Sequence, residues 1–355
     1  LKSYVVNKGV SAGTYGFVNI LDDDINTTGT SQQGNVGNTA WTHTVAPMYG
    51  FFTWQQDVRY NYGRTNKLND DATLKTLYTR INHVNNIVDL IDDMPHATEE
   101  DAALYHRVKG EALFARSQFY FTLANLYGRP YRLDSAAVDL CVPLKLTSYV
   151  EHNKDKETQF ARATNAEVYA QVAKDLETAA SELTVSPQPD RFRLHRASAE
   201  AANLLLSRVY LYMQRWSDAE KAARRVVESP RAKLATIASL QSGQPFLTRN
   251  NAEILFTQGA NNLAASDRNT SLTGAPADYC VAQELYDLFS EFDARRNAFF
   301  SKNSLSDSLG LTNKYERTTE ANHISDGFTL RTAEAYLNLA EALVMQGKEA
   351  EANSV

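Results

Sequence analysis

Residues 198–230 read SAEAANLLLSRVYLYMQRWSDAEKAARRVVESP, and their pattern is the strongest indication of the fold class. It predicts a helix over 198–213 and a turn at Gln214-Arg215-Trp216. A second helix is expected to open at the capping box Ser217-Asp218-Ala219-Glu220, in which the serine and the glutamate satisfy each other's backbone amides. Ser229-Pro230 ends this helix, because proline cannot continue it. The stretch is therefore predicted to be a helical hairpin.

The hairpin has the length and the packing residues of a tetratricopeptide repeat, which is about 34 residues long. Its residues at the expected offsets are Ser207, Tyr210, Trp216, Ala219 and Pro230. A second match begins at Ala333 and uses Tyr336, Leu339, Ala340, Leu343, Gly347 and Ala352. Two matches predict an all-α fold, in which tetratricopeptide-type hairpins form a scaffold with long irregular loop insertions and a few short strands. Since a half hairpin leaves one apolar face uncovered, we expect the natural protein to continue beyond Val355.

Three further helices are predicted upstream of this hairpin. Apolar residues at three- and four-residue spacing predict a helix over 71–92. A helix over 101–127 is opened by Thr98-Glu99-Glu100-Asp101 and closed by Gly128-Arg129-Pro130, and another starts at the capping box Thr164-Asn165-Ala166-Glu167. The segments 10–65, 231–280 and 301–328 are rich in loop residues, and Glu253–Gln258 is predicted to be an isolated strand among them. We expect a single domain over 1–355.

Composition excludes several classes of function. The formal net charge of -6 and the lack of a polybasic block argue against nucleic-acid binding. Pairs such as Arg224-Arg225 are interpreted as solvated helix faces. No apolar run of about 18 residues is present, so no membrane span is predicted. The two cysteines, Cys141 and Cys280, form neither a disulfide framework nor a zinc spacing and are expected to be buried thiols.

Signatures of catalysis and of metal binding are weak. The histidines lack metal-ligand spacing, and the acidic residues stand mostly at helix starts and on exposed faces. Asp22–Asn26 resembles the opening of a calcium loop, but Thr27 replaces the required glycine and Gln33 the closing glutamate. We therefore predict no catalytic residues, no metal site and no cofactor.

Several segments resemble one family in one co-linear order. Glu111–Gly128 (EALFARSQFYFTLANLYG) resembles the most recognisable helix of the SusD/RagB proteins, and Val142-Pro143-Leu144 resembles the short strand that follows it. Similar landmarks are found in Leu77–Ile87, Glu167–Ala179, Glu253–Phe256, Leu285–Phe289, Asp293–Arg295 and Arg331–Tyr336. The resemblance covers about residues 70–355.

This resemblance implies a lipid-anchored protein of the outer membrane that faces outward. Such proteins cap a SusC-like TonB-dependent transporter and hand it oligosaccharides, or peptides in some members. The lipidated cysteine and the usual C-terminal portion of the family are absent from the chain, so the lipid anchor is implied by resemblance alone.

Binding a sugar without converting it requires flat apolar surface together with amides and arginines for the hydroxyl groups. Two loops, 41–66 and 259–279, have this composition, and we expect them to form opposing walls of one site. The candidate ligand-binding residues are Trp41, Tyr49, Trp54, Arg59, Tyr60, Asn61, Tyr62, Arg64, Asn261, Asn262, Arg268 and Tyr279. The competing interpretation is that the first cluster is a hydrophobic plug under a long loop.

Three alternatives remain open. A peptide-binding member of the same family would use backbone-pairing edges and apolar or acidic pockets in place of flat aromatic surfaces. A tetratricopeptide adaptor for other proteins would stack its repeats without long aromatic insertions. A helical-toroid glycoside hydrolase would space its helices evenly along the chain, and this chain does not.

Overall fold

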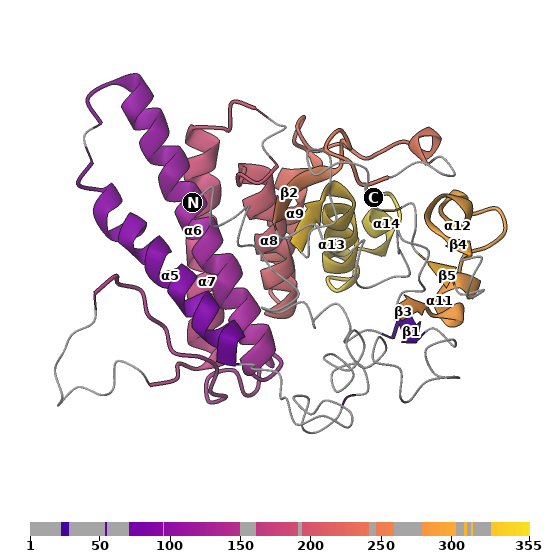
Figure 1. Ribbon diagram of the computed structural model, residues 1–355, viewed down its shortest axis with the longest axis horizontal. Coiled ribbons are helices and arrows are strands. Elements are labelled where there is room, and N and C mark those ends of the chain that lie inside the picture. Colours follow the sequence, from indigo (N-terminus) through magenta and orange to yellow (C-terminus); the bar gives the residue numbers. More distant parts are fainter. Residues whose placement is uncertain are drawn as a thin grey trace, which may run out of the picture. The chain divides into compact units, whose positions relative to one another are not determined.

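The computed structural model of the chain describes residues 23–27, 54, 71–94, 96–149, 161–190, 194–240, 246–258, 279–302, 309–310, 314 and 328–355 (Figure 1). The chain divides into two compact units. The helical unit comprises Leu74–Leu234, Ala252–Phe256 and Leu330–Val355. The irregular unit comprises Leu1–Thr73, Ala235–Asn251 and Thr257–Thr329. The expectation of one domain over 1–355 stays a prediction.

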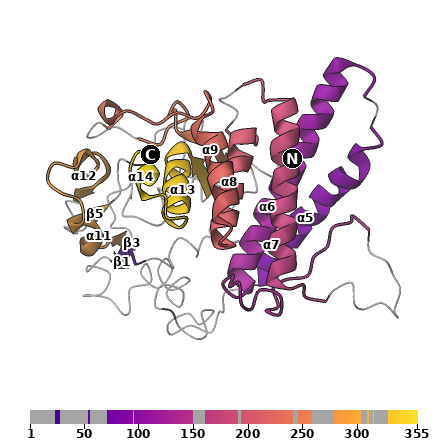
Figure 2. The same ribbon diagram turned by 180° about the vertical axis from the view of Figure 1, so that it is seen from behind.

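The elements of the helical unit are α5 (Asp71–Ile91), α6 (Glu99–Tyr127), α7 (Asn165–Val185), α8 (Ala199–Tyr212), α9 (Trp216–Val227), α13 (Thr332–Val344) and α14 (Glu349–Ala352). In the helical unit α6 packs on α7, α7 on α8, α8 on α9, α9 on α13 and α13 on α14, and this helical architecture confirms the predicted all-α class. Figures 1 and 2 show α6, α7 and α8 side by side from both faces. Among the described residues, no helix has the length and hydrophobicity needed to cross a membrane.

Helix α6 makes its most extensive contact with α7, and its sequence explains why. Thr98 caps its start by accepting from the amide of Asp101 at 3.1 Å, and the amide of Gly128 bonds the carbonyl of Ala124 at its end. Every residue from Gly110 to Phe121 is buried, so the helix has no exposed polar face over three turns. A Cβ atom at Gly110 would lie 2.6 Å from Cγ of Leu183, and glycine thus permits the close approach of α7.

Helix α7 begins as predicted. The side chain of Thr164 accepts from the amide of Glu167, and the carboxylate of Glu167 accepts from the amide of Thr164 at 2.7 Å. The capping box is therefore confirmed. The predicted apolar positions Val168, Val172 and Leu176 are all buried.

The two tetratricopeptide matches form turns of the same geometry. Gln214, between α8 and α9, has φ 57°, and Gly347, between α13 and α14, has φ 73°. In the first turn the amide of Arg215 donates to the carbonyl of Tyr210 at 2.8 Å. In the second turn the amide of Lys348 donates to the carbonyl of Leu343 at 3.0 Å. Glycine adopts the left-handed backbone conformation readily, whereas a residue with a side chain is destabilised in it by about 1–2 kcal/mol. The shared turn confirms that both segments are hairpins of one type.

The capping box predicted at Ser217–Glu220 is wrong. Helix α9 starts at Trp216, after Arg215, and no side chain caps it. Glu220 instead accepts from Lys348 at 2.7 Å, from Gln346 at 2.9 Å and from Arg224 at 2.9 Å. These bonds tie α9 to the turn that follows α13, so the glutamate stabilises the packing of two hairpins.

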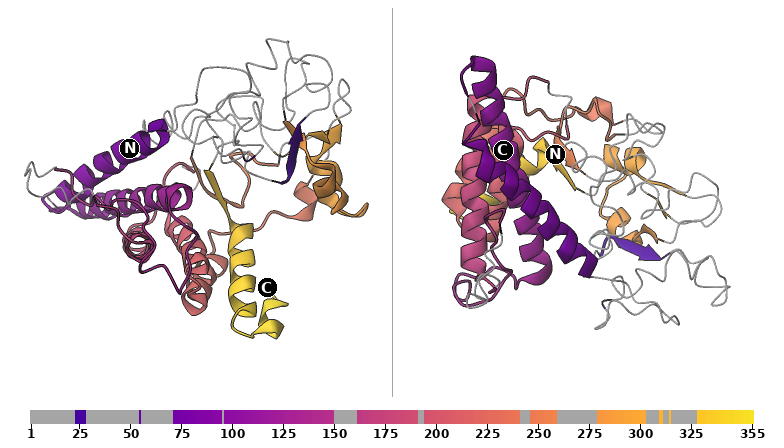
Figure 3. Two further views of the ribbon diagram at one scale, coloured as in Figure 1. Left: turned by 90° about the horizontal axis from the view of Figure 1, so that it is seen from below. Right: turned by 60° about the vertical axis from the view of Figure 1, so that its left-hand side comes forward.

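The described strands form three two-stranded sheets: β1 (Ile25–Thr27) with β3 (Tyr279–Val281), β2 (Ile254–Gln258) with β6 (Phe328–Arg331), and β4 (Ser301–Lys302) with β5 (Leu309–Gly310). The prediction that β2 is an isolated strand is therefore wrong, because β6 pairs with it. Figure 3 shows β6 running directly into α13. The predicted strand Val142–Leu144 is also wrong: these residues are not part of a strand, although Val142 accepts a bond from the amide of Ala163 at 3.1 Å and the nearby Leu140 forms an isolated bridge with Thr164. Short helical segments are η3 (Ile237–Ser239), α11 (Gln283–Asp287) and α12 (Ala294–Phe299).

Glu220 makes the packing of α9 on α13 sensitive to acid. Burial alone would raise the pKa of Glu220, but hydrogen bonds from Lys348, Arg224 and Gln346 outweigh it and lower the pKa to about 2, from an ordinary value of 4.5. A carboxylate whose pKa is lower in the folded state stabilises the protein above its unfolded pKa, and this stability is lost as pH falls. We expect the free energy of unfolding to fall between pH 4.5 and 2 more steeply in the wild type than in Glu220→Gln.

Urea denaturation at intervals across this window measures the difference. Glu228→Gln is the matched control, because Glu228 is an exposed carboxylate at the end of the same helix. If Glu220→Gln and Glu228→Gln follow the same pH curve, the three donors do not stabilise the folded protein.

Candidate ligand-binding site

Trp54 is the predicted site residue whose side chain the structure describes. It is 68 % exposed, and its φ of 53° lies in the left-handed region that bulky side chains rarely adopt. Exposure of a tryptophan forgoes the stabilisation that burial of a large ring provides. Such a strained and exposed aromatic residue supports a role in binding rather than in packing.

The remaining predicted residues stay predictions. Outside the described residues lie Trp41, Tyr49, Arg59, Tyr60, Asn61, Tyr62, Arg64, Asn261, Asn262 and Arg268. The backbone of Tyr279 belongs to β3, where it pairs with Thr27 of β1. The amide of Ala282 extends this pairing by bonding the carbonyl of Asp24 at 2.9 Å. The ladder therefore holds the end of the 259–279 loop against an N-terminal segment of the same unit.

A cluster of aromatic and arginine side chains follows β3 directly, and it is not among the predicted site residues. Phe300 contacts Tyr286 and Phe289 edge to face, with ring centroids 5.4 Å and 5.1 Å apart. Arg296 lies 4.4 Å from the Tyr286 ring and Arg295 lies 5.0 Å from the Phe289 ring. Three aromatic residues and two adjacent arginines within 15 positions are a signal that could have pointed to this cluster.

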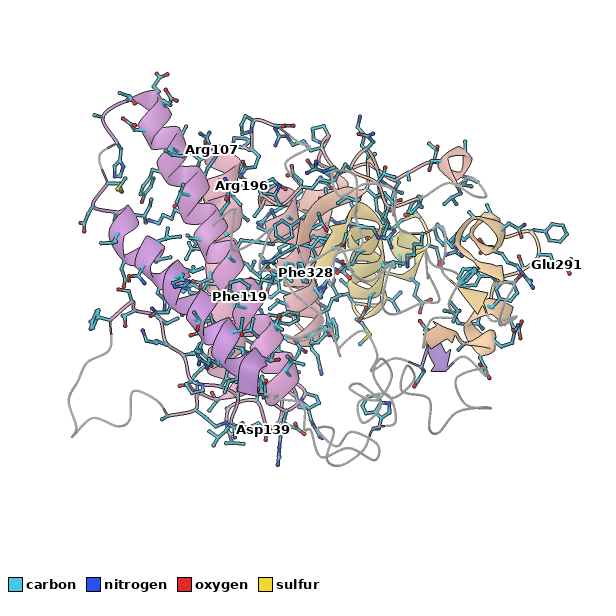
Figure 4. All side chains as sticks on the ribbon, viewed as in Figure 1. Arg107, Phe119, Asp139, Arg196, Glu291 and Phe328 are labelled. Atoms are coloured by element: carbon cyan, nitrogen blue, oxygen red, sulfur yellow. The ribbon has the colours of Figure 1, made fainter. Side chains whose placement is uncertain are left out.

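The turn between α11 and α12 exposes apolar side chains. Phe292 is 96 % exposed and Leu288 is 81 % exposed. Figure 4 labels Glu291 in the same turn. Asp293 caps α12 by accepting from the amide of Arg295 at 2.9 Å, so the turn has a defined conformation. The irregular unit thus presents aromatic surface at this turn as well as at Trp54.

The helical unit contains a groove of about 520 Å³, which we call the three-helix groove. Its floor is α8, with Asn203, Leu206 and Tyr210, and its walls are one face each of α7 and α9. Tyr210 donates a hydrogen bond to the carboxylate of Glu177, and the guanidinium of Arg215 lies 4.4 Å from the Tyr210 ring. Burial and the neighbouring Glu177 raise the pKa of Tyr210, which keeps its hydroxyl a donor.

The buried carboxylates of the helical unit are engaged in structural ion pairs. Arg116 binds Asp175 at 2.6 Å, and Arg196 binds Glu111 at 2.6 Å. Figure 4 labels Arg196, whose partner Glu111 lies on α6. Burial raises the pKa of Glu111, although the bond from Arg196 opposes this shift. Within the part of the chain that the structure describes, no three His, Cys, Asp or Glu side chains gather as metal ligands.

The SusD-like family described as starch-binding and associating with the outer membrane matches residues 14–211, which is more than half of the chain. The chain belongs to this family. The resemblance to SusD/RagB proteins is therefore confirmed, and so is an association of the family with the outer membrane. The family's match includes Trp54 and the 41–66 loop, and it ends within α8. No curated protein sequence matches the chain.

Solved structures share the fold over nearly the whole chain. A SusD superfamily protein from Bacteroides thetaiotaomicron VPI-5482 is 23 % identical, with a TM-score of 0.70 over 97 % of this chain and 73 % of its own. A SusD-like carbohydrate binding protein from Bacteroides vulgatus ATCC 8482 is 21 % identical, with a TM-score of 0.65 over 96 % and 71 %. The surface glycan-binding protein A from Bacteroides uniformis is 18 % identical, with a TM-score of 0.62 over 95 % and 71 %.

Proposed function

We propose that the protein captures oligosaccharides at the cell surface and passes them to a SusC-like TonB-dependent transporter in the outer membrane. The observation that carries this proposal is the exposed, strained Trp54 in a chain of a family described as starch-binding. Two of the similar structures bear the names of carbohydrate- or glycan-binding proteins. In this proposal the protein is held at the outer leaflet by a lipid anchor and faces outward.

Within this function, aromatic rings of the 41–66 loop stack on the sugar, and the 259–279 loop forms the opposite wall. An exposed indole ring presents a flat apolar face to the C–H bonds of a pyranose. Arginine and asparagine side chains of the same loops then bind the sugar hydroxyl groups. The protein binds the glycan without hydrolysing it, since no step of capture and transfer requires a bond to break.

A second candidate ligand is a peptide. It is favoured by Phe292 and Leu288 in the turn between α11 and α12, because their exposed apolar side chains can contact the apolar side chains of a peptide. Both ligand classes can be screened with one soluble glycan panel and one peptide pool.

Replacing Trp54 with alanine is expected to weaken glycan binding about tenfold and to leave stability unchanged. An aromatic stacking contact contributes about 1–1.5 kcal/mol, which corresponds to at most about tenfold in Kd. Because the side chain is 68 % exposed, its loss should change the free energy of unfolding by no more than about 0.5 kcal/mol. Calorimetry against the best glycan of the panel measures affinity, and thermal melting measures stability. Tyr60→Ala should behave in the same way.

Tyr149→Ala is the matched control, because Tyr149 is 69 % exposed and belongs to the helical unit. Its affinity should equal that of the wild type. Several degrees lost in Tm without a specific loss of affinity would mean that the loop aromatics are a hydrophobic plug. Glycan shortened during prolonged incubation, by an activity that one Asp or Glu substitution abolishes, would place the protein among enzymes.

A further inference from the structure

The apolar turn, as we call residues 132–140, follows α6 and exposes several apolar side chains. Leu133 is 67 % exposed, Val138 is 74 % exposed and Leu140 is 50 % exposed. Figure 4 labels Asp139 within this turn. Each exposed side chain forgoes the stabilisation that burial provides. Three of them in one short segment indicate an interaction surface, whereas a single one would be ordinary.

Backbone hydrogen bonds give the apolar turn a defined conformation. The amide of Ala136 donates to the carbonyl of Arg132 at 2.8 Å. The turn also accepts from the start of α7, where the amide of Asn165 donates to the carbonyl of Asp139 at 2.8 Å. The next amide, that of Ala166, donates to the carbonyl of Ala136 at 2.9 Å. The exposed apolar side chains are therefore held in place by the first turn of a long helix.

A guanidinium group lies beside the apolar turn. Arg162 donates to the carbonyl of Leu140 at 2.7 Å and to the carbonyl of Cys141 at 2.5 Å. No carboxylate of the described residues forms an ion pair with Arg162, and its Nη1 donates no bond among them. Glu167 lines the same shallow groove, but its carboxylate accepts from the amide and the hydroxyl of Thr164. The donors at Nη1 are therefore available to a phosphate group.

Charge distinguishes the apolar turn from the opposite end of α6, which also exposes apolar side chains. Leu90 is 61 % exposed and Leu104 is 49 % exposed. The acidic residues that lie between these two in the chain are Asp92, Asp93, Glu99, Glu100 and Asp101. Around the apolar turn three cations match three carboxylates: Arg129, Arg132 and Arg162 against Asp134, Asp139 and Glu167. In a chain of net charge -6, the apolar turn is thus the end of α6 that an anionic surface does not repel.

Tyrosine rings lie at the same end of the helical unit. Tyr131, the residue before the turn, packs on Tyr169 of α7 with ring centroids 4.9 Å apart. Tyr212, at the end of α8, is 47 % exposed and packs on Phe121 of α6 at 5.2 Å. Phe121 and Tyr169 are themselves 5.9 Å apart, so one row of aromatic contacts joins the two outer tyrosines. Partly exposed tyrosines are typical of membrane–water interfaces, where the ring is apolar and the hydroxyl is hydrated.

We propose that the apolar turn inserts Leu133 and Val138 into the lipid surface of the outer membrane, with its arginines at the phosphate groups. Apolar side chains are stabilised when they leave water for the acyl boundary, and arginine keeps its charged end among the headgroups. This lipid contact is a second attachment beside the proposed lipid anchor. It rests on the proposed function for its place at the outer membrane, but it does not depend on the capture of glycans.

The test is flotation of the full chain with vesicles of two compositions: phosphatidylethanolamine with phosphatidylglycerol, and phosphatidylcholine alone. The wild type should bind both, and the anionic vesicles more tightly at low salt. Leu133→Ser combined with Val138→Ser should weaken binding to both at least about tenfold, because the inserted apolar area is lost. Asp134→Asn should strengthen binding to the anionic vesicles about fivefold, because it removes the carboxylate that pairs with Arg132.

Leu90→Ser combined with Leu104→Ser is the matched control, because it removes two exposed leucines from the acidic end of α6. This variant should bind vesicles as the wild type does. Wild-type protein that floats with neither kind of vesicle would overturn the proposal, and so would an Asp134→Asn variant that binds the anionic vesicles no more tightly. Equal binding by the two leucine variants would also overturn it, and would mean that the apolar turn faces protein rather than lipid. Affinity for the best glycan of the panel, measured in parallel, should be the same in all variants, so a failure of glycan capture is seen separately.

Discussion

Replacing Arg116 with methionine is expected to lower the free energy of unfolding by about 3–5 kcal/mol, because it leaves a buried carboxylate without its cation. Arg116 on α6 and Asp175 on α7 have side chains only 6 % and 5 % exposed. The guanidinium binds both carboxylate oxygens, Nε to Oδ2 at 2.6 Å and Nη2 to Oδ1 at 2.8 Å. After the substitution, Gln171 would be the one remaining donor to Asp175 among the bonds described.

The same guanidinium also connects α6 to an extended segment. Its Nη1 donates to Oδ1 of Asn85 at 3.1 Å, and Asn85 in turn donates to the carbonyls of Lys145 and Thr147 at 2.9 Å and 3.2 Å. Tyr120 adds a bond from its hydroxyl to the carbonyl of Lys145 at 2.7 Å. We therefore expect the amides near residues 145–148 to exchange faster in Arg116→Met, as measured by hydrogen–deuterium exchange.

Urea denaturation measures the loss of stability, and Arg132→Met is the matched control. Arg132 pairs with Asp134 at 2.9 Å, but both side chains are more than 60 % exposed. Exposed pairs contribute about 0–1 kcal/mol, so this control should change stability little. The double variant Arg116→Met with Asp175→Leu should recover part of the loss, since no unpaired charge remains. Equal effects of Arg116→Met and Arg132→Met would contradict the argument.

Local signals were sufficient to predict most of the helices. The caps at Thr98 and Thr164 and the stop at Gly128 act within four residues of the atoms that they bind, so a short window of sequence contains both partners. The apolar period of α5 predicted its bounds to within one residue. Such features depend on neighbours in the chain and can therefore be predicted without the fold.

Errors occurred where a partner lies far away in the chain. Glu220 was assigned to a capping box with Ser217, but it binds Gln346 and Lys348, more than 120 positions later. Strand β2 was predicted to be isolated because β6 is about 70 positions away and only four residues long. No local pattern distinguishes a glutamate that caps its own helix from one that joins two hairpins.

The candidate sites could likewise be predicted only where the signal is local in the sequence. The composition of the 41–66 loop pointed to Trp54, whose exposure the structure confirms. The interpretation of Arg224-Arg225 as a solvated helix face is consistent with the exposed side chain of Arg225, which donates to Asn203 of α8. The three-helix groove was not predicted, because its lining residues come from α7, α8 and α9. A site formed by faces of three helices depends on how the helices pack, and the sequence of any one helix does not predict that packing.

Replacing Phe114 with alanine is the second change with a large expected effect, about 3–5 kcal/mol in the free energy of unfolding. Phe114 on α6 is 1 % exposed and meets Phe256 of β2 edge to face, with ring centroids 4.9 Å apart. Its removal deletes this contact and opens a cavity that the surrounding helix can fill only in part. Phe256 would also lose its neighbour, so β2 would be held less firmly against α6.

The loss should spread to the C-terminal hairpin, because Glu253, the residue before β2, is bonded to it within the helical unit. The amide of Thr332, the first residue of α13, bonds the carbonyl of Glu253 at 2.8 Å, and the carboxylate of Glu253 pairs with Arg331 at 3.3 Å. In Phe114→Ala, amide exchange in α13 should therefore rise together with the fall in urea midpoint. Phe292→Ala removes an identical ring that is 96 % exposed and should change stability by about 0.5 kcal/mol or less. A Phe114→Ala variant as stable as Phe292→Ala would mean that the contact between Phe114 and Phe256 does not stabilise the packing of β2 on α6, and that contacts with α8 and α9 hold the C-terminal hairpin.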